Sequence, residues 1–81
     1  MPAWVSSPVH REIVAALIEA RRQRGMTQRD LAAALGKPPS FIGKIEAIER
    51  NVSVLEFVAW ARAVEADPSA LLPLGGEVPE L

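Results

Sequence analysis

The chain has 81 residues and a formal net charge of −1, and 49% of its residues are hydrophobic. This length allows one small domain, and this apolar content favours a folded chain. The absence of cysteine excludes a disulfide framework and a thiolate metal site, and the single histidine, His10, cannot build a zinc site. No apolar run reaches the roughly 20 residues of a membrane span, and the N-terminus lacks a signal-peptide pattern, so we expect a cytoplasmic protein.

The charge is unevenly distributed along the chain. Residues 21–50 hold seven basic and three acidic residues, a net charge of +4, whereas the remainder holds two basic and seven acidic residues, a net charge of −5. A positive middle between acidic flanks is typical of a local nucleic-acid contact that the whole-chain charge conceals. An ordinary solvated charged face is the alternative interpretation.

Start and stop signals predict two helices before residue 37. Ser7 caps the first helix, with Pro8 at its first position, and this helix ends near Gly25. Its apolar stripe, at helical spacing, comprises Val9, Ile13, Ala16, Leu17 and Ala20. Thr27 caps a short second helix that ends at Gly36. The apolar face of this second helix comprises Leu31, Ala32 and Leu35.

Residues 36–39, with the sequence GKPP, predict a sharp turn followed at once by a third helix. Each proline disfavours the α conformation in the residue before it, so we expect Lys37 and Pro38 to be extended. Pro39 has a φ angle suited to the first turn of a helix, where its missing N–H is not needed. The expected inward-facing residues of this helix are Ile42 and Ile45, with Phe41 at the flank. The opposite face comprises Pro39, Ser40, Gly43, Lys44 and Ala47.

A fourth helix follows a capping-box pattern formed by Ser53 and Glu56. Asp67 caps a last short helix through Pro68. The expected core stripe of the fourth helix comprises Val54, Phe57, Ala61 and Val64, joined by Trp60, and the last helix contributes Leu71 and Leu72. No strand pattern of useful length occurs, so the sequence predicts an all-α fold, a compact bundle of about five helices.

The second and third helices form the pattern of a helix-turn-helix, because they are short and joined by a tight turn that contains glycine. In this motif the first helix braces against the DNA backbone and the second lies in the major groove. The small residues Ala32, Ala33 and Ala34 allow close approach of a neighbouring helix. From spacing alone, a small helical bundle that does not bind DNA is the alternative.

Several short sequence motifs indicate a more specific relationship. They are R-x-x-x-G-M-T-Q-x-x-L-A, then L-G at the turn, I-x-K-I-E in the third helix, and A-R-A-V followed by D-P-S-A-L-L. In this order they resemble the helix-turn-helix family of phage Cro and CI repressors, also called the XRE family, from about Leu17 to Leu72. The stretch PPSFIGKIEAIER also resembles a bacterial subgroup with the pattern P-x-S-F-x-x-K-x-E-x-x-E-R.

The resemblance implies a five-helix, lambda-repressor-like DNA-binding domain that needs no cofactor. Family members are typically dimeric, sequence-specific DNA-binding proteins and often repressors. The domain should occupy residues 8–73, with an N-terminal arm at 1–7 and a flexible tail at 74–81.

By position, the resemblance assigns direct DNA contacts to the third helix and its surroundings. The base-contacting set is Pro39, Ser40, Gly43 and Lys44, and the phosphate-contacting set is Gln28, Lys37, Phe41 and Arg50. Lys44 is the strongest candidate for base readout, as a donor to guanine O6 or N7. Phe41 could instead meet a thymine methyl group or simply pack partly buried. The resemblance also predicts a structural ion pair between Arg21 and Glu46, which ties the first helix to the third.

Two positions depart from the family pattern. Ile48 holds the place of the glycine that usually ends the third helix. Because a β-branched residue resists a left-handed conformation, we expect this helix to continue to about Arg50, with Asn51 as its cap. Pro39 replaces a frequent polar base reader, so specificity should rest on Lys44, on apolar contact and on DNA shape.

A domain of this size is expected to read DNA as a homodimer. The candidate interface residues are Ile48, Val52 and Leu55, with Leu74, Val78 and Leu81 of the tail. Trp4 and Val5 either cover the core or extend that surface. Leu55 falls off the core stripe, although a single surface leucine needs no explanation.

The leading hypothesis is therefore a double-stranded DNA-binding transcription regulator, most simply a repressor that occludes a promoter. The alternative is a protein-interaction module, such as the antitoxin of a toxin–antitoxin pair or an anti-repressor. The acidic net charge, Pro39 and Ile48 keep that alternative open. An enzyme is not expected, because the sequence has one histidine, no cysteine and no glycine-rich phosphate loop.

Overall fold

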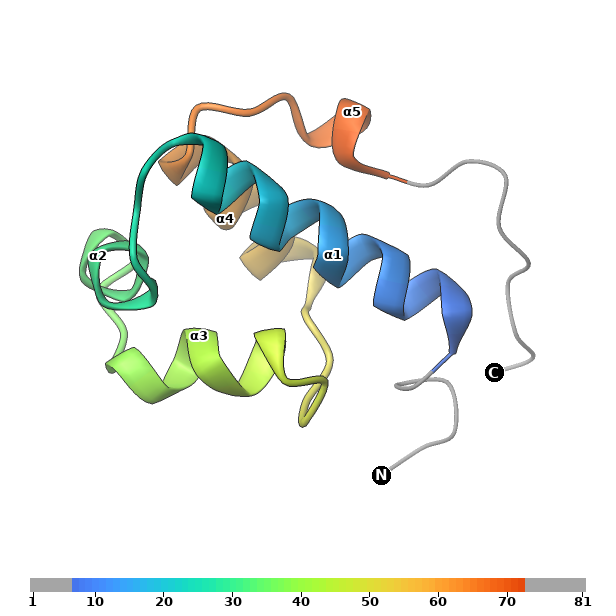
Figure 1. The fold of residues 1–81 in the computed structure, drawn as a ribbon, viewed down its shortest axis with the longest axis horizontal. Helices are drawn as coiled ribbons and strands as arrows, with labels where there is room; N and C mark the ends of the chain where they lie inside the picture. The colour runs from blue at the N-terminus through green and yellow to red at the C-terminus, as the bar shows by residue number, and fades with distance from the viewer. Residues whose placement is uncertain (1–6, 73–81) are drawn as a thin grey trace.

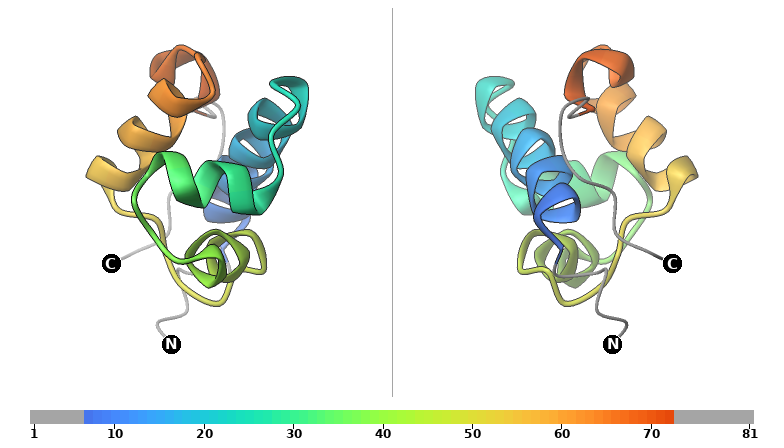
Figure 2. Two further views of the ribbon diagram at one scale, coloured as in Figure 1. Left: turned by 90° about the vertical axis from the view of Figure 1, so that its left-hand side faces the viewer. Right: turned by 90° about the vertical axis from the view of Figure 1, so that its right-hand side faces the viewer.

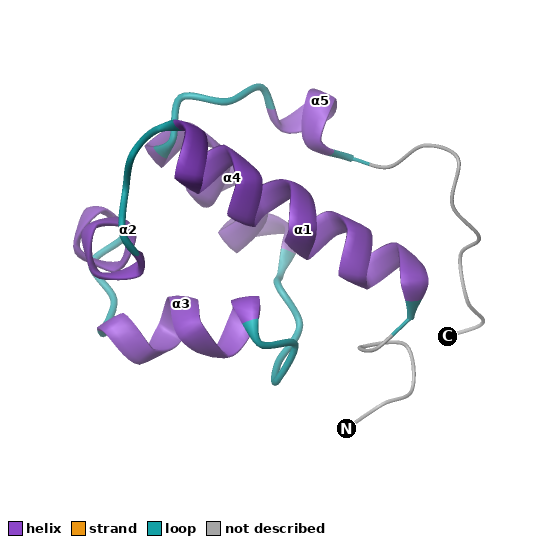
Figure 3. Ribbon diagram, in the orientation of Figure 1, coloured by secondary structure: helices purple, strands orange, loops and turns teal. Residues whose placement is uncertain are grey.

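A computed structural model describes residues 7–72, which form five α-helices and, within that range, no strand (Figures 1 and 3). They are α1 (Pro8–Gln23), α2 (Gln28–Ala34), α3 (Pro39–Glu46), α4 (Val54–Ala63) and α5 (Pro68–Leu71). The predicted all-α bundle is confirmed. Apart from Ser7, the predicted arm and tail lie outside the described residues, together with Trp4, Val5, Leu74, Val78 and Leu81. Across residues 7–72, no helix is long and apolar enough to cross a membrane.

The arrangement places α3 along one edge of the helix bundle. In Figure 1, α2 is seen end-on while α3 runs across the view, and in Figure 2 (left) the two exchange these orientations, so their axes cross steeply. The pair α2 and α3 makes the most extensive contact between helices, and α1 packs against α3, α4 and α5. In both figures α5 lies on the opposite side of the bundle from α3.

Local side-chain caps explain where four of the five helices begin. The Ser7 hydroxyl accepts a hydrogen bond from the third residue of α1, and the Asp67 carboxylate accepts one from the second residue of α5. Thr27 and Ser53 each form a complete capping box, with Asp30 for α2 and Glu56 for α4. α3 differs, because its N-cap is Pro38, in the expected extended conformation, and no side chain caps it.

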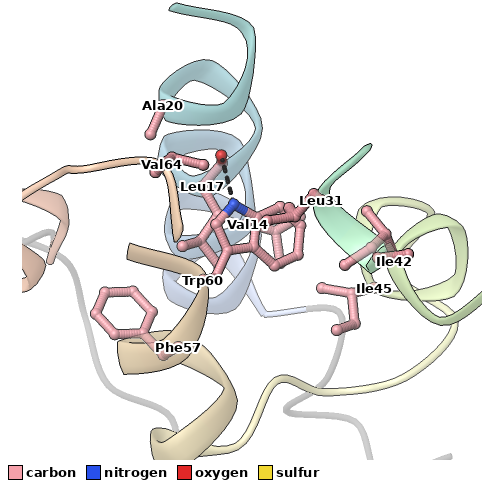
Figure 4. Close-up of a cluster of buried hydrophobic side chains, with 10 residues drawn as sticks. Val14, Leu17, Ala20, Leu31, Ile42, Ile45, Phe57, Trp60 and Val64 are labelled. Carbon is pink, nitrogen blue, oxygen red and sulfur yellow. Dashed lines mark hydrogen bonds between the residues drawn. The ribbon is translucent and has the colours of Figure 1, made fainter. Parts of the chain in front are cut away.

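Trp60 of α4 lies at the centre of the core (Figure 4). Its indole N–H donates a hydrogen bond of 3.1 Å to the carbonyl oxygen of Leu17 in α1. This bond satisfies the polar atom of the ring, so the indole is buried without an unpaired donor. The other large side chains that are fully buried come from α1, α2 and α3, and they are Val14, Leu17, Leu31, Ile42 and Ile45.

The four longer helices end in the same way, with one residue in the left-handed conformation just after the helix. In α1 and α2 that residue is a glycine, Gly25 with φ 74° and Gly36 with φ 68°. In α3 and α4 it is Ile48 with φ 60° and Glu65 with φ 58°. In each case the next backbone N–H closes the turn, in the pairs Met26 to Arg21, Lys37 to Ala32, Glu49 to Lys44 and Ala66 to Ala61.

The predicted continuation of α3 to Arg50, with Asn51 as its cap, is wrong. α3 ends at Glu46, and Ile48 adopts the left-handed conformation that its β-branched side chain disfavours. This conformation costs about 1–2 kcal/mol for an L-residue. The Ile48 side chain packs partly buried against the core, and this burial opposes the cost.

Two predicted core stripes are also corrected. Val54 is 82% exposed, because it occupies the first position of α4 and lies beyond the packed part of that helix. In α1, Val14 is fully buried, whereas Ile13 is only partly covered. Ile13 and Val14 both fit the 3.6-residue period of a helix. Which of them faces the core depends on where α3 and α4 pack against α1.

Candidate nucleic-acid interface

α3 presents a surface of small and polar residues on the edge of the bundle. Ile42 and Ile45 are both 0% exposed and face the core, as predicted, so the residues between them face outward. Ser40 and Lys44 are four residues apart and share one face of the helix. The exposed predicted base-contacting residues are Pro39, Ser40 and Lys44, and Gly43 is partly covered. Because Ser40 and Gly43 are small, the α3 backbone beside them can approach another molecule closely.

Gln28, at the start of α2, reaches across to α3. Its Nε2 donates a hydrogen bond of 2.9 Å to Oε1 of Glu46. A Cβ atom added to Gly43 would lie 3.6 Å from Oε1 of Gln28, so the amide lies against α3 at this glycine. The structure therefore brings together a residue predicted to contact phosphate and one predicted to face the bases.

Arg21 and Glu46 form a two-pronged ion pair between α1 and α3. Nε of Arg21 donates to Oε2 of Glu46 at 2.6 Å, and Nη2 donates to Oε1 at 3.0 Å. The third nitrogen, Nη1, donates to the carbonyl oxygen of Met26 at 2.8 Å. The two side chains are only 10% and 8% exposed. Paired and covered in this way, the charges fix α3 relative to α1.

Three members of the predicted phosphate-contacting set lie together at the N-terminal end of α3. Nζ of Lys37 is 5.5 Å from the centre of the Phe41 ring, and Cζ of Arg50 is 4.8 Å from it. Phe41 itself is partly buried and packs against the core. The α2–α3 turn and the α3–α4 loop thus meet on one aromatic ring.

Arg50 has a second partner in Glu56 of α4. Its Nη2 donates to the two carboxylate oxygens at 3.1 and 3.0 Å. The same carboxylate accepts the backbone N–H of Ser53 at 2.9 Å as part of the α4 capping box. Burial acts to raise the pKa of the Glu56 carboxyl, but the hydrogen bonds from Ser53 and Arg50 hold it below its ordinary value. Sequence reasoning missed this partner, which a basic residue six positions before a capping-box glutamate could have suggested.

The predicted dimer-interface residues are divided by the structure. Ile48 and Val52 pack partly buried against the core, whereas Leu55 is 80% exposed. Val54 and Leu72, which are 82% and 45% exposed, were not among the candidates. An apolar groove of about 360 Å³ lies beside them, lined by residues that include Ile13, Val52, Val54, Phe57, Val58 and Leu72. Val54 and Leu55 are consecutive, and two consecutive residues of a helix cannot both face one core.

The described part of the chain holds no group of three or more His, Asp or Glu side chains arranged to bind a metal ion.

Comparison with known proteins also identifies a helix-turn-helix domain. A family model described as helix-turn-helix (HTH_3) matches residues 17–71. Among solved structures, an XRE-family like protein from Pseudomonas syringae pv. tomato str. DC3000 is 44% identical, with a TM-score of 0.73 over 76% of each chain. Among curated proteins, none matches this sequence.

Two further solved structures are regulators. The restriction-modification controller protein C.AhdI from Aeromonas hydrophila is 31% identical, with a TM-score of 0.68 over 75% of this chain and 92% of that chain. The clp gene regulator ClgR from C. glutamicum is 29% identical, with a TM-score of 0.72 over 80% and 86% of the two chains. This chain therefore belongs to the XRE family of helix-turn-helix DNA-binding transcription regulators.

Proposed function

We propose that this protein is a sequence-specific repressor that binds double-stranded DNA as a homodimer, with α3 in the major groove. The observation that carries the proposal is the exposed face of α3, where Ser40 and Lys44 stand on a helix whose other face is buried. Lys44 donates to guanine O6 or N7, and Ser40 bonds a base edge or a phosphate. Occupancy of a promoter by the dimer would block transcription.

A salt titration of DNA binding tests this function. The DNA is a duplex from the region upstream of the protein's own gene, with a random duplex of equal length beside it. We expect tight binding to the upstream duplex and a steep fall of affinity with salt, because each neutralised phosphate contributes about −0.9 to the log–log slope. A wild-type protein with no preference for this duplex over the random one would count against the proposal.

Lys44→Ala separates base readout from general attraction. The variant should lose about 1–3 kcal/mol of discrimination between the two duplexes, as expected for a lost base contact. Arg62→Ala is the matched control, since Arg62 is an exposed basic residue of α4 outside the proposed interface. It should leave the preference between duplexes unchanged. Equal effects of the two substitutions would remove Lys44 from the base-contacting set.

The apolar surface formed by Val54 and Leu72 supports the homodimer. These two side chains are 82% and 45% exposed and border the apolar groove between α1, α4 and α5, whereas Leu55, 80% exposed, borders a separate groove with Lys37 and Phe41. A second copy that covers this surface would remove apolar area from water and place two α3 helices on one duplex. Val54→Glu should give a monomer in analytical ultracentrifugation with weakened specific binding, whereas Ala15→Glu, on an exposed position of α1, should remain a dimer.

The same surface favours a second candidate function, the binding of a different protein, as in an antitoxin. Exposed apolar patches mark protein interaction sites in general. If the wild-type chain is a monomer at tens of micromolar and Val54→Glu leaves DNA binding unchanged, the homodimer is excluded and the binding of another protein becomes the candidate role of this surface.

A further inference from the structure

Phe41 carries two cations on a single aromatic ring at the start of α3. Lys37 comes from the α2–α3 turn and Arg50 from the α3–α4 loop, and their charged groups lie 5.5 and 4.8 Å from the ring centre. Both distances fall within the roughly 6 Å over which a ring face attracts a cation. The ring therefore joins two basic residues that are 13 positions apart in the sequence.

The ring is itself held in place. Phe41 is partly buried against the core, one residue before the fully buried Ile42. Because packing fixes the ring, the ring determines where the two flexible basic side chains lie.

Arg50 is also held by Glu56, and two of its nitrogens keep N–H groups that are not hydrogen-bonded within residues 7–72. Only its Nη2 bonds to Glu56, and within residues 7–72 its Nε and Nη1 donate no hydrogen bond. The Arg50 side chain is 34% exposed and the Glu56 side chain 24% exposed, so the guanidinium is the more accessible partner. A guanidinium with two free donor groups and a fixed plane suits a phosphate, which it can bind through two hydrogen bonds.

We propose that Phe41 is a positioning residue for phosphate binding. Its ring holds Lys37 and Arg50 beside the N-terminal end of α3, so that both cations meet the DNA backbone where α3 enters the groove. Pre-positioning reduces the side-chain freedom that is lost on binding, which strengthens the complex. This inference rests on the proposed function and deepens it, because it assigns Phe41 to backbone contact through its two neighbours and not to the bases.

The role differs measurably from the other two roles open to Phe41. A contact with a thymine methyl group changes the preference between DNA sequences. A purely packing role changes the stability of the fold and leaves the DNA affinity of the folded protein unchanged. A positioning role lowers the affinity for all duplexes by the same factor.

The experiment compares Phe41→Leu, which removes the ring and keeps an apolar side chain, with Phe41→Tyr, which keeps the ring. Each variant is first melted by circular dichroism, and binding is then measured at a temperature at which all variants are folded. Phe41→Leu should weaken binding to the upstream and random duplexes equally, by about tenfold, the effect expected when one or two long side chains lose their fixed position. Phe41→Tyr should bind as the wild type does.

A double-mutant cycle with Arg50→Gln links the effect to the cation. In the wild-type background this substitution should weaken binding and lower the salt slope by about one unit. In the Phe41→Leu background it should cost several-fold less affinity, because Arg50 is no longer held. Arg50→Gln alters a side chain that is 34% exposed, and an unchanged affinity and salt slope in this variant would overturn the inference even if Phe41→Leu does not fold.

Three further results would overturn the inference. Independent effects of the two substitutions would show that the ring does not position Arg50. A changed preference between duplexes in Phe41→Leu would assign the ring to a base, and an unchanged affinity would assign it to packing. If the wild type binds the random duplex with a steep salt slope but shows no sequence preference, the proposed function fails while the positioning of phosphate contacts is still measured. If the wild type binds no DNA, both fail.

Discussion

The two helices of the helix-turn-helix are stabilised in different ways. α2 has its own local signals, with a complete capping box at Thr27 and a glycine, Gly36, at its end. α3 lacks both: Pro39 starts it without a side-chain cap, Gly43 interrupts its interior, and Ile48 ends it in a conformation that favours glycine. α3 is helical because Ile42 and Ile45 are buried and because α1 and α2 hold it.

As a result, the residues that stabilise α3 are different from those on its outer surface. The contacts that fix α3 all lie on its inner side, including the bonds that Glu46 accepts from Arg21 and Gln28. Ser40 and Lys44 lie on the outer side and are exposed. Substitutions on the outer face should therefore change DNA binding with little effect on folding.

The largest effect should come from removing the anchor of α3. Glu46→Gln leaves Arg21 as a covered charge without its partner, so we expect a loss of about 3–5 kcal/mol in the free energy of unfolding, measured by urea denaturation. Arg24→Gln is the control, because the ion pair of Arg24 with Glu65, at 2.8 Å, is 51% and 68% exposed. That substitution should cost less than about 1 kcal/mol. Similar losses in both variants would show that the covered pair is not the anchor.

The ends of the two helices provide the next comparison. Gly36→Ala should destabilise the fold by about 1–2 kcal/mol, because alanine resists the left-handed conformation that glycine accepts. At position 48, glycine and alanine both lose the packing of isoleucine, but only alanine keeps the left-handed strain. Ile48→Gly should therefore be more stable than Ile48→Ala by about 1 kcal/mol. The reverse order in thermal unfolding would show that residue 48 is not left-handed.

The start of α2 should contribute a smaller amount. Thr27→Ala removes the hydroxyl that accepts the N–H of Asp30 at 3.0 Å, and we expect a loss of about 1 kcal/mol. Thr27→Ser keeps the hydroxyl and should retain most of the stability. If the serine variant is as unstable as the alanine variant, the cap is not the cause.

The smallest effect should be a gain. Gly43→Ala should stabilise the protein by about 0.5–1 kcal/mol, because glycine is unfavourable inside a helix. The added methyl group would lie 3.6 Å from Gln28, an ordinary contact distance. A lower melting temperature in this variant would mean that α3 needs the open space at Gly43, and the contrast with α2 would then be less sharp.

The parts of the fold that could be predicted from the sequence are those with local causes. Ser7, Thr27, Ser53 and Asp67 act as caps through bonds to residues two or three positions ahead, and all four were predicted. The fate of Ile48 could not be predicted, because its local preference opposes the left-handed turn and only its packing against the core favours it.

In the candidate site, too, a feature set by one helix could be predicted, whereas features set by packing between elements could not. The outward face of α3 follows from the inward direction of Ile42 and Ile45, so it could be predicted from the helical period. The bond from Gln28 to Glu46 and the contacts of Arg50 with Phe41 and Glu56 could not, since they depend on how separate helices and loops pack.

The bond between Trp60 and the carbonyl oxygen of Leu17 joins residues 43 positions apart, and the whole helix-turn-helix lies in the loop that this bond closes. This bond holds α1 and α4 together. α3, in contrast, has no side-chain N-cap and ends at a left-handed isoleucine. Segments with few stabilising interactions of their own open without global unfolding, and their amide hydrogens then exchange early with solvent. We expect the amides at the ends of α3 to exchange faster than those of α1 around Leu17. The ends of the helix proposed to enter the groove would then open and re-form while its centre, with the buried Ile42 and Ile45, stays packed.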